Sequence, residues 1–184
     1  MSIKETILKD CFIIDPKVFK DKRGYFLESF NQESFQKATG LQIDFVQDNE
    51  SFSTKGVLRG LHFQKGKYSQ AKLIRVISGE ILDVVVDIRP DSPTFLQHFS
   101  IKLSSNNKKQ LFVPKHFAHG FLVLSETAII NYKCDEYYHK ESESGIIYND
   151  RHLNIDWLLE SKDFILSEKD QKLPSCRELF SIKG

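Results

Sequence analysis

Six histidines stand out among the residues of this chain that could bind a metal or transfer protons. Small β-barrels often hold a divalent ion through two histidines at positions i and i+2, a carboxylate and a later histidine. His62 is instead followed by Phe63 and Gln64, and no carboxylate follows within a short loop. His116 and His119 are three residues apart in a segment without regular periodicity, which is a weak signal. The spacing therefore disfavours a metal site.

Four longer segments are more informative than the isolated histidines. They are residues 21–30 (DKRGYFLESF), 47–49 (QDN), 56–64 (GVLRGLHFQ) and 113–121 (VPKHFAHGF). In these segments, and in their order and spacing, the chain resembles the dTDP-4-dehydrorhamnose 3,5-epimerase family, whose members use no cofactor. The resemblance runs from about Phe12 to residues 167–170 and so covers most of the chain.

The resemblance implies a substrate and a set of site residues. The substrate would be dTDP-4-dehydro-6-deoxy-D-glucose, a dTDP-4-keto-6-deoxy sugar, converted at carbons 3 and 5 to dTDP-4-dehydro-L-rhamnose. His62 matches the general base, Asp170 its carboxylate partner, Tyr132 the general acid and Lys72 the cation near the keto oxygen. The positions that match nucleotide and sugar contacts are Arg23, Phe26, Glu28, Gln47, Asn49, Arg59, His119, Tyr138, Glu143 and Lys169. The family also implies a jelly-roll homodimer in which about residues 1–30 are exchanged with the partner.

These residue types suit the implied reaction. A ketone acidifies the hydrogens on both flanking carbons, so a neutral imidazole such as His62 can remove one if the developing enolate is stabilised, for example by Lys72. Inversion takes a proton from one face and returns another to the opposite face, which requires an acceptor and a donor. Tyr132 fits the donor, and a carboxylate such as Asp170 can fix the imidazole tautomer.

Each of these residues also has a purely structural interpretation. A lone histidine in an apolar setting, like His62, is more often a satisfied core residue. Asp170 also fits the third position of a capping box opened by Ser167. Tyr132 could be a core aromatic, and Lys72 a residue at a sheet edge with a buried stem. The joint occurrence of all four in one order favours catalysis.

The elements that must position these residues are mainly strands. Leu82, Val84, Val86 and Ile88 share one parity while Ile81, Asp83, Val85 and Asp87 share the other, which predicts a strand with one apolar face. Segments 95–103 and 128–133 repeat the two-residue period, and residues 45–135 show no helical period. We therefore predict an all-β fold, an antiparallel jelly-roll or cupin-like β-barrel.

Helical signals are confined to the two ends of the chain. Residues 33–39 lie between a polar N-cap, Asn31, and a terminating glycine, Gly40. Residues 167–170 and 175–178 both have capping-box spacing, so residues from about 150 to 184 are predicted to form a helical appendage. No repeat or linker divides the chain, and residues 1–184 are expected to form a single domain.

Composition limits the classes of partner. The 26 Lys and Arg against 25 Asp and Glu argue against nucleic acid or an anionic membrane as a partner, so a diphosphate would be met by local groups such as Arg23, Arg59 and Lys169. Three cysteines without a CxxC pair indicate reduced thiols. The first residues have no signal-peptide core and apolar stretches are short, so we expect a cytoplasmic protein.

Three other functions remain open from the sequence. A single-position epimerase on a related dTDP-4-keto sugar needs the same acid and base. A non-catalytic sugar-nucleotide-binding barrel would not need both a base such as His62 and a donor such as Tyr132. A metal-dependent oxygenase or isomerase is disfavoured because the His-x-His spacing is missing.

Overall fold

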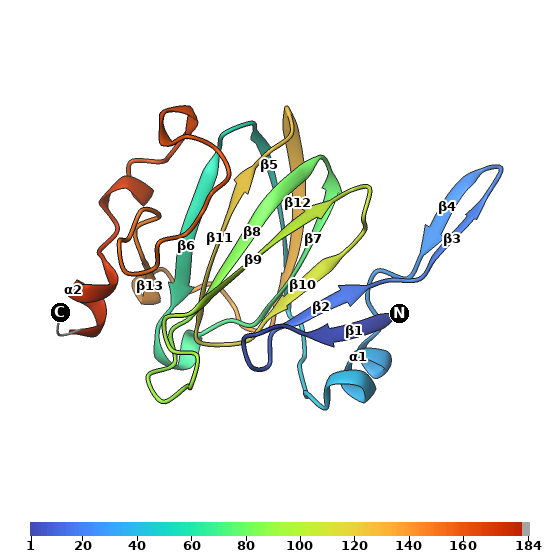
Figure 1. Ribbon diagram of the computed structural model, residues 1–184. Coiled ribbons are helices and arrows are strands. Elements are labelled where there is room, and N and C mark those ends of the chain that lie inside the picture. Colours follow the sequence, from blue (N-terminus) through green and yellow to red (C-terminus); the bar gives the residue numbers. More distant parts are fainter. Residues whose placement is uncertain (182–184) are drawn as a thin grey trace.

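The computed structural model describes residues 1–181, which form two facing antiparallel sheets and a projecting hairpin (Figure 1). The six-stranded sheet has the order β1 (Ser2–Glu5), β2 (Phe12–Asp15), β10 (Gln110–Val113), β7 (Lys72–Ser78), β12 (Thr127–Cys134) and β5 (Gln47–Thr54). The five-stranded sheet has the order β13 (Glu143–Gly145), β6 (Leu58–Gln64), β11 (Phe117–Val123), β8 (Glu80–Asp87) and β9 (His98–Ser104). The predicted all-β class is confirmed. Strand β9 begins three residues later than the alternation from Phe95 suggests, because residues 93–96 form a turn.

Strand β8 differs from its prediction in an informative way, because both of its faces are buried. Leu82, Val84 and Val86 pack in a cluster under the C-terminal segment, on the outer face of the five-stranded sheet. Ile81 and Val85 face the other sheet and join the core between the two sheets. The parity of Ile81 is shared by Asp83 and Asp87, so two aspartates lie on the buried inner face of this strand.

The N-terminal helix is confirmed where the capping signals place it. Helix α1 (Gln32–Thr39) starts at Asn31, whose side chain accepts a hydrogen bond from the Ser34 N–H, and ends at Gly40 with a φ of 74°. Its one fully buried side chain is Phe35, with its ring centroid 5.0 Å from that of Phe112. The helix therefore covers the outer face of the six-stranded sheet.

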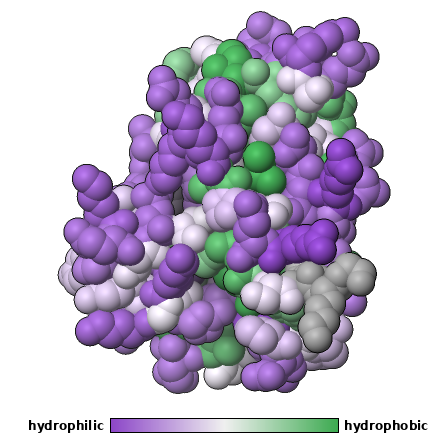
Figure 2. Space-filling view, turned by 90° about the vertical axis from the view of Figure 1, so that its left-hand side faces the viewer, coloured by the Kyte–Doolittle hydropathy of each residue, from purple (hydrophilic) through white to green (hydrophobic). Residues whose placement is uncertain are grey.

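The C-terminal segment is less helical than predicted. Beyond residue 150 the structure contains one short helix, α2 (Cys176–Phe180), and two 3₁₀ turns, Ser161–Asp163 and Asp170–Lys172; residues 182–184 of the predicted appendage lie outside the described part. The capping box of Ser175 and Glu178 is confirmed at α2. The rest of the segment runs irregularly because widely spaced apolar residues, Leu153 and Trp157 among them, anchor it on the five-stranded sheet. Figure 2 shows that its outer surface is mostly hydrophilic.

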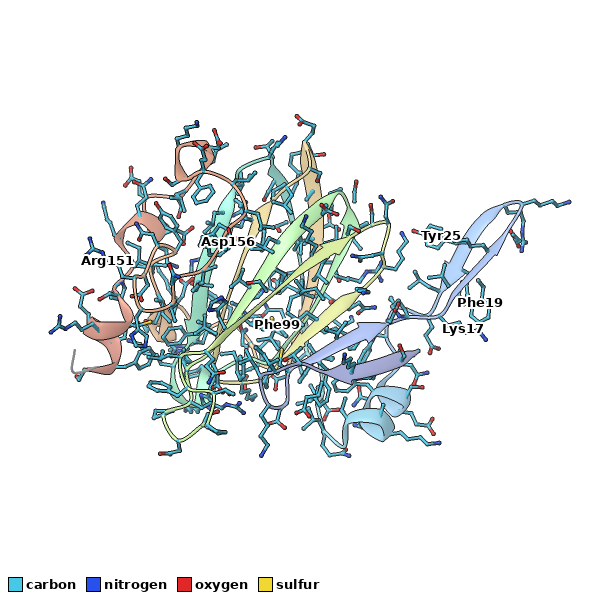
Figure 3. The ribbon with its side chains drawn as sticks, in the orientation of Figure 1. Lys17, Phe19, Tyr25, Phe99, Arg151 and Asp156 are labelled. Atoms are coloured by element: carbon cyan, nitrogen blue, oxygen red, sulfur yellow. The ribbon has the colours of Figure 1, made fainter. Side chains whose placement is uncertain are left out.

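The hairpin of β3 (Val18–Asp21) and β4 (Gly24–Leu27) extends away from both sheets (Figures 1 and 3). Its aromatic residues are exposed, with 51% of Phe19, 57% of Tyr25 and 69% of Phe26 accessible to solvent. Strands β1 and β2, in contrast, pair with each other and with β10 of the same chain. Within the segment 1–30, for which exchange is predicted, the hairpin is thus the part that projects from the fold. No helix within residues 1–181 is long and apolar enough to cross a membrane.

Candidate active site

The two sheets enclose a cavity of about 260 Å³ at one end of the fold. Strand β6 contributes Arg59 and His62 to its wall, and the opposite sheet contributes Lys72 from β7 and Tyr132 from β12. The full lining is Ser51, Arg59, His62, Lys72, His119, Phe121, Tyr132, Ser167, Lys169 and Asp170. The C-terminal segment thus closes a space that two sheets form. All four residues predicted to be catalytic lie here.

Two glycines explain how Arg59 and His62 reach the same cavity. Residues three apart on a regular strand point to opposite faces. Phe121 pairs with Arg59 and His119 with His62, so β6 carries one extra residue between the two pairs, and this β-bulge restores a common face. A Cβ on Gly60, whose φ is 124°, would lie 2.6 Å from the Cα of Gly120. Both positions therefore require glycine.

His62 forms a pair with Asp170, the first residue of a 3₁₀ turn. The Nε2 atom of His62 contacts Oδ1 of Asp170, while Oδ2 accepts a hydrogen bond of 2.8 Å from the Ser167 hydroxyl. Burial acts to raise the pKa of Asp170, but the His62 contact and the Ser167 hydroxyl lower it more, so this pKa lies below its usual range. The capping interaction also exists, because the Asp170 N–H donates to Ser167 Oγ at 3.1 Å. Asp170 therefore contacts His62 and also bonds to Ser167, although the reciprocal bond of a capping box, from the Ser167 N–H to the Asp170 side chain, is absent among residues 1–181.

Lys72 and Tyr132 lie on the inner face of the six-stranded sheet. Cys134 pairs with Lys72 and Tyr132 with Ile74, so these four side chains share one face. Burial lowers the pKa of Lys72 and raises that of Tyr132. The phenol therefore keeps its proton at neutral pH, as a donor must.

A second compartment of about 280 Å³ adjoins the first and shares His62, Lys72 and Tyr132 with it. Polar side chains line it: Gln47, Asn49, Gln64, Gln70, Tyr138 and Glu143. Tyr138 donates from its hydroxyl to Glu143 at 2.8 Å, and Glu143 also pairs with Lys169. The two compartments together offer the elongated polar site that a nucleotide sugar requires.

The hydrogen bonds of Gln47 and Gln64 fix the walls of this second compartment. The Tyr138 N–H donates to Gln47 Oε1 at 3.1 Å, and Gln47 Nε2 donates to Asn49 at 3.0 Å. Buried Gln64 accepts from the His139 N–H at 2.6 Å and donates to the Tyr68 carbonyl at 2.9 Å. The loop that carries Tyr138 is thereby tied to the strand that carries His62.

His119 adds a second histidine–carboxylate pair. It stands opposite His62 across β6 and β11, and its Nε2 lies 2.9 Å from Oδ2 of Asp83, which is 0% exposed. Arg59 donates to Ser53 Oγ at 3.2 Å and makes no ion pair within residues 1–181. Its charge is therefore available to an anionic ligand.

Three of the predicted contact residues do not reach the cavity. Arg23 and Phe26 lie on the exposed hairpin, where Arg23 pairs with Asp21 at 2.6 Å. Glu28 follows the hairpin and accepts from Asn31 at 3.3 Å. The hairpin instead lines a shallow hollow of its own.

Sequence reasoning missed several residues that shape the site. Ser51 and Phe121 line the first compartment, and Gln64 and Gln70 line the second. Asp83 forms a hydrogen bond with His119. Their strand parity was the available signal, because Ser51 shares a face with Asn49, and Asp83 lies on the inner face of β8. Among the described residues, no group of three His, Cys, Asp or Glu is placed to hold a metal ion, and the three cysteines are buried and free.

Comparison with known proteins identifies the family. The family model for dTDP-4-dehydrorhamnose 3,5-epimerase matches residues 5–178. The chain belongs to the dTDP-4-dehydrorhamnose 3,5-epimerase family. The Escherichia coli (strain K12) protein with that name is 50% identical over 183 residues, which cover 100% of this chain and 98% of the relative.

Two solved structures of similar proteins share this fold. The dTDP-4-dehydrorhamnose 3,5-epimerase of Elizabethkingia anophelis is 53% identical, with a TM-score of 0.94 over 97% of both chains. The dTDP-6-deoxy-D-glucose-3,5-epimerase of Legionella pneumophila, in complex with dTDP-4-keto-L-rhamnose, is 48% identical, with a TM-score of 0.91 over 95% of this chain and 92% of that one. The predicted jelly-roll architecture is therefore that of the family.

Proposed function

We propose that the chain catalyses epimerisation of dTDP-4-dehydro-6-deoxy-D-glucose at carbons 3 and 5, giving dTDP-4-dehydro-L-rhamnose. One observation carries the proposal beyond family membership. His62 on the five-stranded sheet, paired with Asp170 of the C-terminal segment, lines the same cavity as the half-buried Tyr132 and Lys72 on the opposite sheet. A sugar ring held between the sheets then meets a base on one face and a proton donor on the other.

In the proposed mechanism, His62 removes the proton from the carbon beside the ketone. The ionised carboxylate of Asp170 stabilises the imidazolium that forms. The ammonium of Lys72 stabilises the enolate oxygen, and the low-dielectric cavity strengthens this interaction. Tyr132 then delivers a proton to the opposite face, which inverts the carbon. The carbon on the other side of the ketone reacts in the same way, because the carbonyl acidifies both.

The second compartment and Arg59 are proposed to hold the nucleotide. Arg59 offers its guanidinium to a phosphate, for which its planar fork of donors is suited. The exposed ring of Tyr138 offers a stacking surface for the base, and Gln47 and Asn49 offer amide groups for its edge. Lys169 contributes a second positive charge beside Glu143.

The exposed hairpin supports a proposed homodimer in which each chain completes the site of its partner. Arg23 and Phe26 match nucleotide contacts of the family but lie on an arm outside the cavity of their own chain. Exposing Phe19, Tyr25 and Phe26 on one isolated hairpin leaves apolar surface that a second copy could cover. Within the predicted exchange segment, residues 1–30, the hairpin of residues 18–27 is proposed to reach the partner.

Hydrogen exchange tests the proposed reaction directly. The protein is incubated with dTDP-4-dehydro-6-deoxy-D-glucose in heavy water, and NMR follows the ring protons. Loss of the protons at carbons 3 and 5, with formation of the L-rhamno product, is the expected result. Exchange and inversion at only one carbon would indicate a single-position epimerase. No exchange, with dTDP still bound, would indicate a binding barrel.

A further inference from the structure

We propose that Asp83 is a positioning residue of this site, whose buried carboxylate orients His119 and compensates the positive charge of Lys72. The inference rests on the proposed epimerisation and deepens it. Asp83 does not itself line the cavity, so it is assigned no contact with substrate. It would act only through the two side chains that do line it.

The bonding of Asp83 is incomplete in a way that is unusual for a buried carboxylate. The side chain is 0% exposed, and Oδ2 is bound by Nε2 of His119 at 2.9 Å. Oδ1 is buried as well, yet no group in residues 1–181 forms a hydrogen bond to it. Buried polar atoms nearly always have a partner, so an exception in a native fold calls for an explanation.

Asp87 shows what a structural aspartate looks like on the same strand. It lies four residues further along the same face of β8 and is also 0% exposed. Both of its oxygens are satisfied: Arg89 donates from Nε to Oδ1 at 2.9 Å and from Nη2 to Oδ2 at 2.7 Å, and the hydroxyls of Ser92 and Thr94 donate to Oδ2 at 2.6 and 2.7 Å. Asp87 therefore closes a turn, whereas nothing comparable satisfies Asp83.

The charges around Lys72 indicate what the free carboxylate oxygen does. Burial lowers the pKa of Lys72, and the negative groups that oppose this effect are Cys134, Asp83 and Glu143. Burial raises the pKa of the Cys134 thiol to about 11, so this group carries no charge at neutral pH. Glu143 already pairs with Lys169. Asp83 is thus the carboxylate near Lys72 that no lysine or arginine neutralises within the described residues.

The remaining titratable and charged groups that line the Lys72 compartments come from β6, β11, β12, the loop after β12 and the C-terminal segment. They are Arg59, His62, His119, Tyr132, Tyr138, Lys169 and Asp170. Asp170 is engaged by His62 and Ser167. Arg59 and Lys169 add positive charge, which makes a protonated Lys72 harder to maintain. A negative charge at Asp83 counteracts them.

The proposal predicts a specific change in the pH profile of kcat. Lys72 must be protonated to stabilise an enolate, and burial lowers its pKa while raising that of Tyr132, so loss of the Lys72 proton sets the alkaline limb. Asp83→Asn keeps the size of the side chain but removes its charge. The alkaline limb should then move to lower pH by roughly one unit, the lower end of the effect of a nearby opposite charge.

Asp87→Asn is the matched control, since it makes the same change at an equally buried position of the same strand. It should lower the thermal midpoint and leave the alkaline limb in place. Glu143→Gln provides a test that does not depend on the folding of Asp83→Asn. The Glu143 side chain is 22% exposed, so solvent screens its charge more than that of Asp83, and its loss should move the limb by less than about half a unit. A larger shift in that variant would make Glu143 the counter-charge and overturn the proposal.

The outcomes separate the two proposals. An Asp83→Asn enzyme whose alkaline limb coincides with that of the wild type, or an Asp87→Asn enzyme with an equal shift, overturns the role of Asp83. A wild-type protein that exchanges no ring proton overturns the proposed function instead. A downward shift in Asp83→Asn alone, with KM changed less than kcat at high pH, supports a role exerted through Lys72.

Discussion

Replacing Tyr132 by phenylalanine separates proton removal from proton delivery. The hydroxyl of Tyr132 forms no hydrogen bond within residues 1–181, so its loss leaves no donor or acceptor unpaired. The ring, and with it the shape of the cavity, is retained. The free energy of unfolding should therefore change by less than about 1 kcal/mol, which corresponds to at most about 4 °C in the thermal midpoint of a chain of this size.

The effect on inversion should be far larger than the effect on stability. A positioned general acid contributes roughly 10²- to 10⁴-fold to the rate, so formation of inverted product should fall by about that factor. His62 and Lys72 remain, so the enolate still forms and recaptures a proton or deuteron on its original face. In heavy water, deuterium should enter the ring while little inverted product accumulates.

NMR of the sugar ring measures exchange and inversion in the same sample. His62→Ala should show neither of them. Tyr148→Phe is a matched control, since its ring packs at 5.7 Å against Phe164, outside both compartments, and should leave both rates unchanged. Inversion at the parental rate in Tyr132→Phe would refute the assignment of the phenol as acid. Unfolding of that variant would support the interpretation of Tyr132 as a core aromatic.

Three further predictions concern the dyad, the hairpin and metal ions. Asp170→Asn should reduce turnover roughly 10- to 150-fold, because a hydrogen bond to a charged group is worth about 1.5 to 3 kcal/mol. The pKa of Asp170 is lowered in the folded protein, so the stability that its carboxylate contributes is lost as pH falls through that pKa. The free energies of unfolding of variant and wild type, measured by urea titration, should therefore converge in acid. Arg23→Ala should weaken dTDP binding in calorimetry, whereas Lys22→Ala on the same hairpin tip should not, and equal affinities would contradict a shared site. Turnover should survive exhaustive chelation, and a loss restored by one divalent metal would contradict the cofactor-free mechanism.

The strands and the first helix could be predicted because their signals are local. Alternation in β8 and β12 and the caps at Asn31 and Gly40 each depend on a few neighbouring residues. The apolar positions of β8 were identified correctly, but its second face was not recognised as buried, since aspartates such as Asp83 ordinarily predict exposure. Only the opposing sheet and the partners of these aspartates reveal the burial.

The site could be predicted only in part, for related reasons. His62 and Asp170 are 108 residues apart, and no periodicity predicts a contact at that separation. The bulge at Gly60, which aligns Arg59 with His62, depends on the approach of Gly120 from another strand. The path of the C-terminal segment follows from scattered anchors such as Trp157, which lack a helical period. Long-range packing decides each of these features.

The facing sheets have a consequence for how this enzyme can change over time. The base is carried by one sheet and the acid by the other, so the gap between them is set by the side chains that hold the sheets apart, including Ile74, Val85 and Ile130. Packed sheets lie about 10 Å apart, and a buried methylene gained or lost is felt by close-packed neighbours. The packing of the hydrophobic core thus sets the separation between the base and the acid. Substitutions of these core residues should lower turnover before they unfold the protein. Natural selection for the reaction should therefore constrain residues that do not contact the sugar.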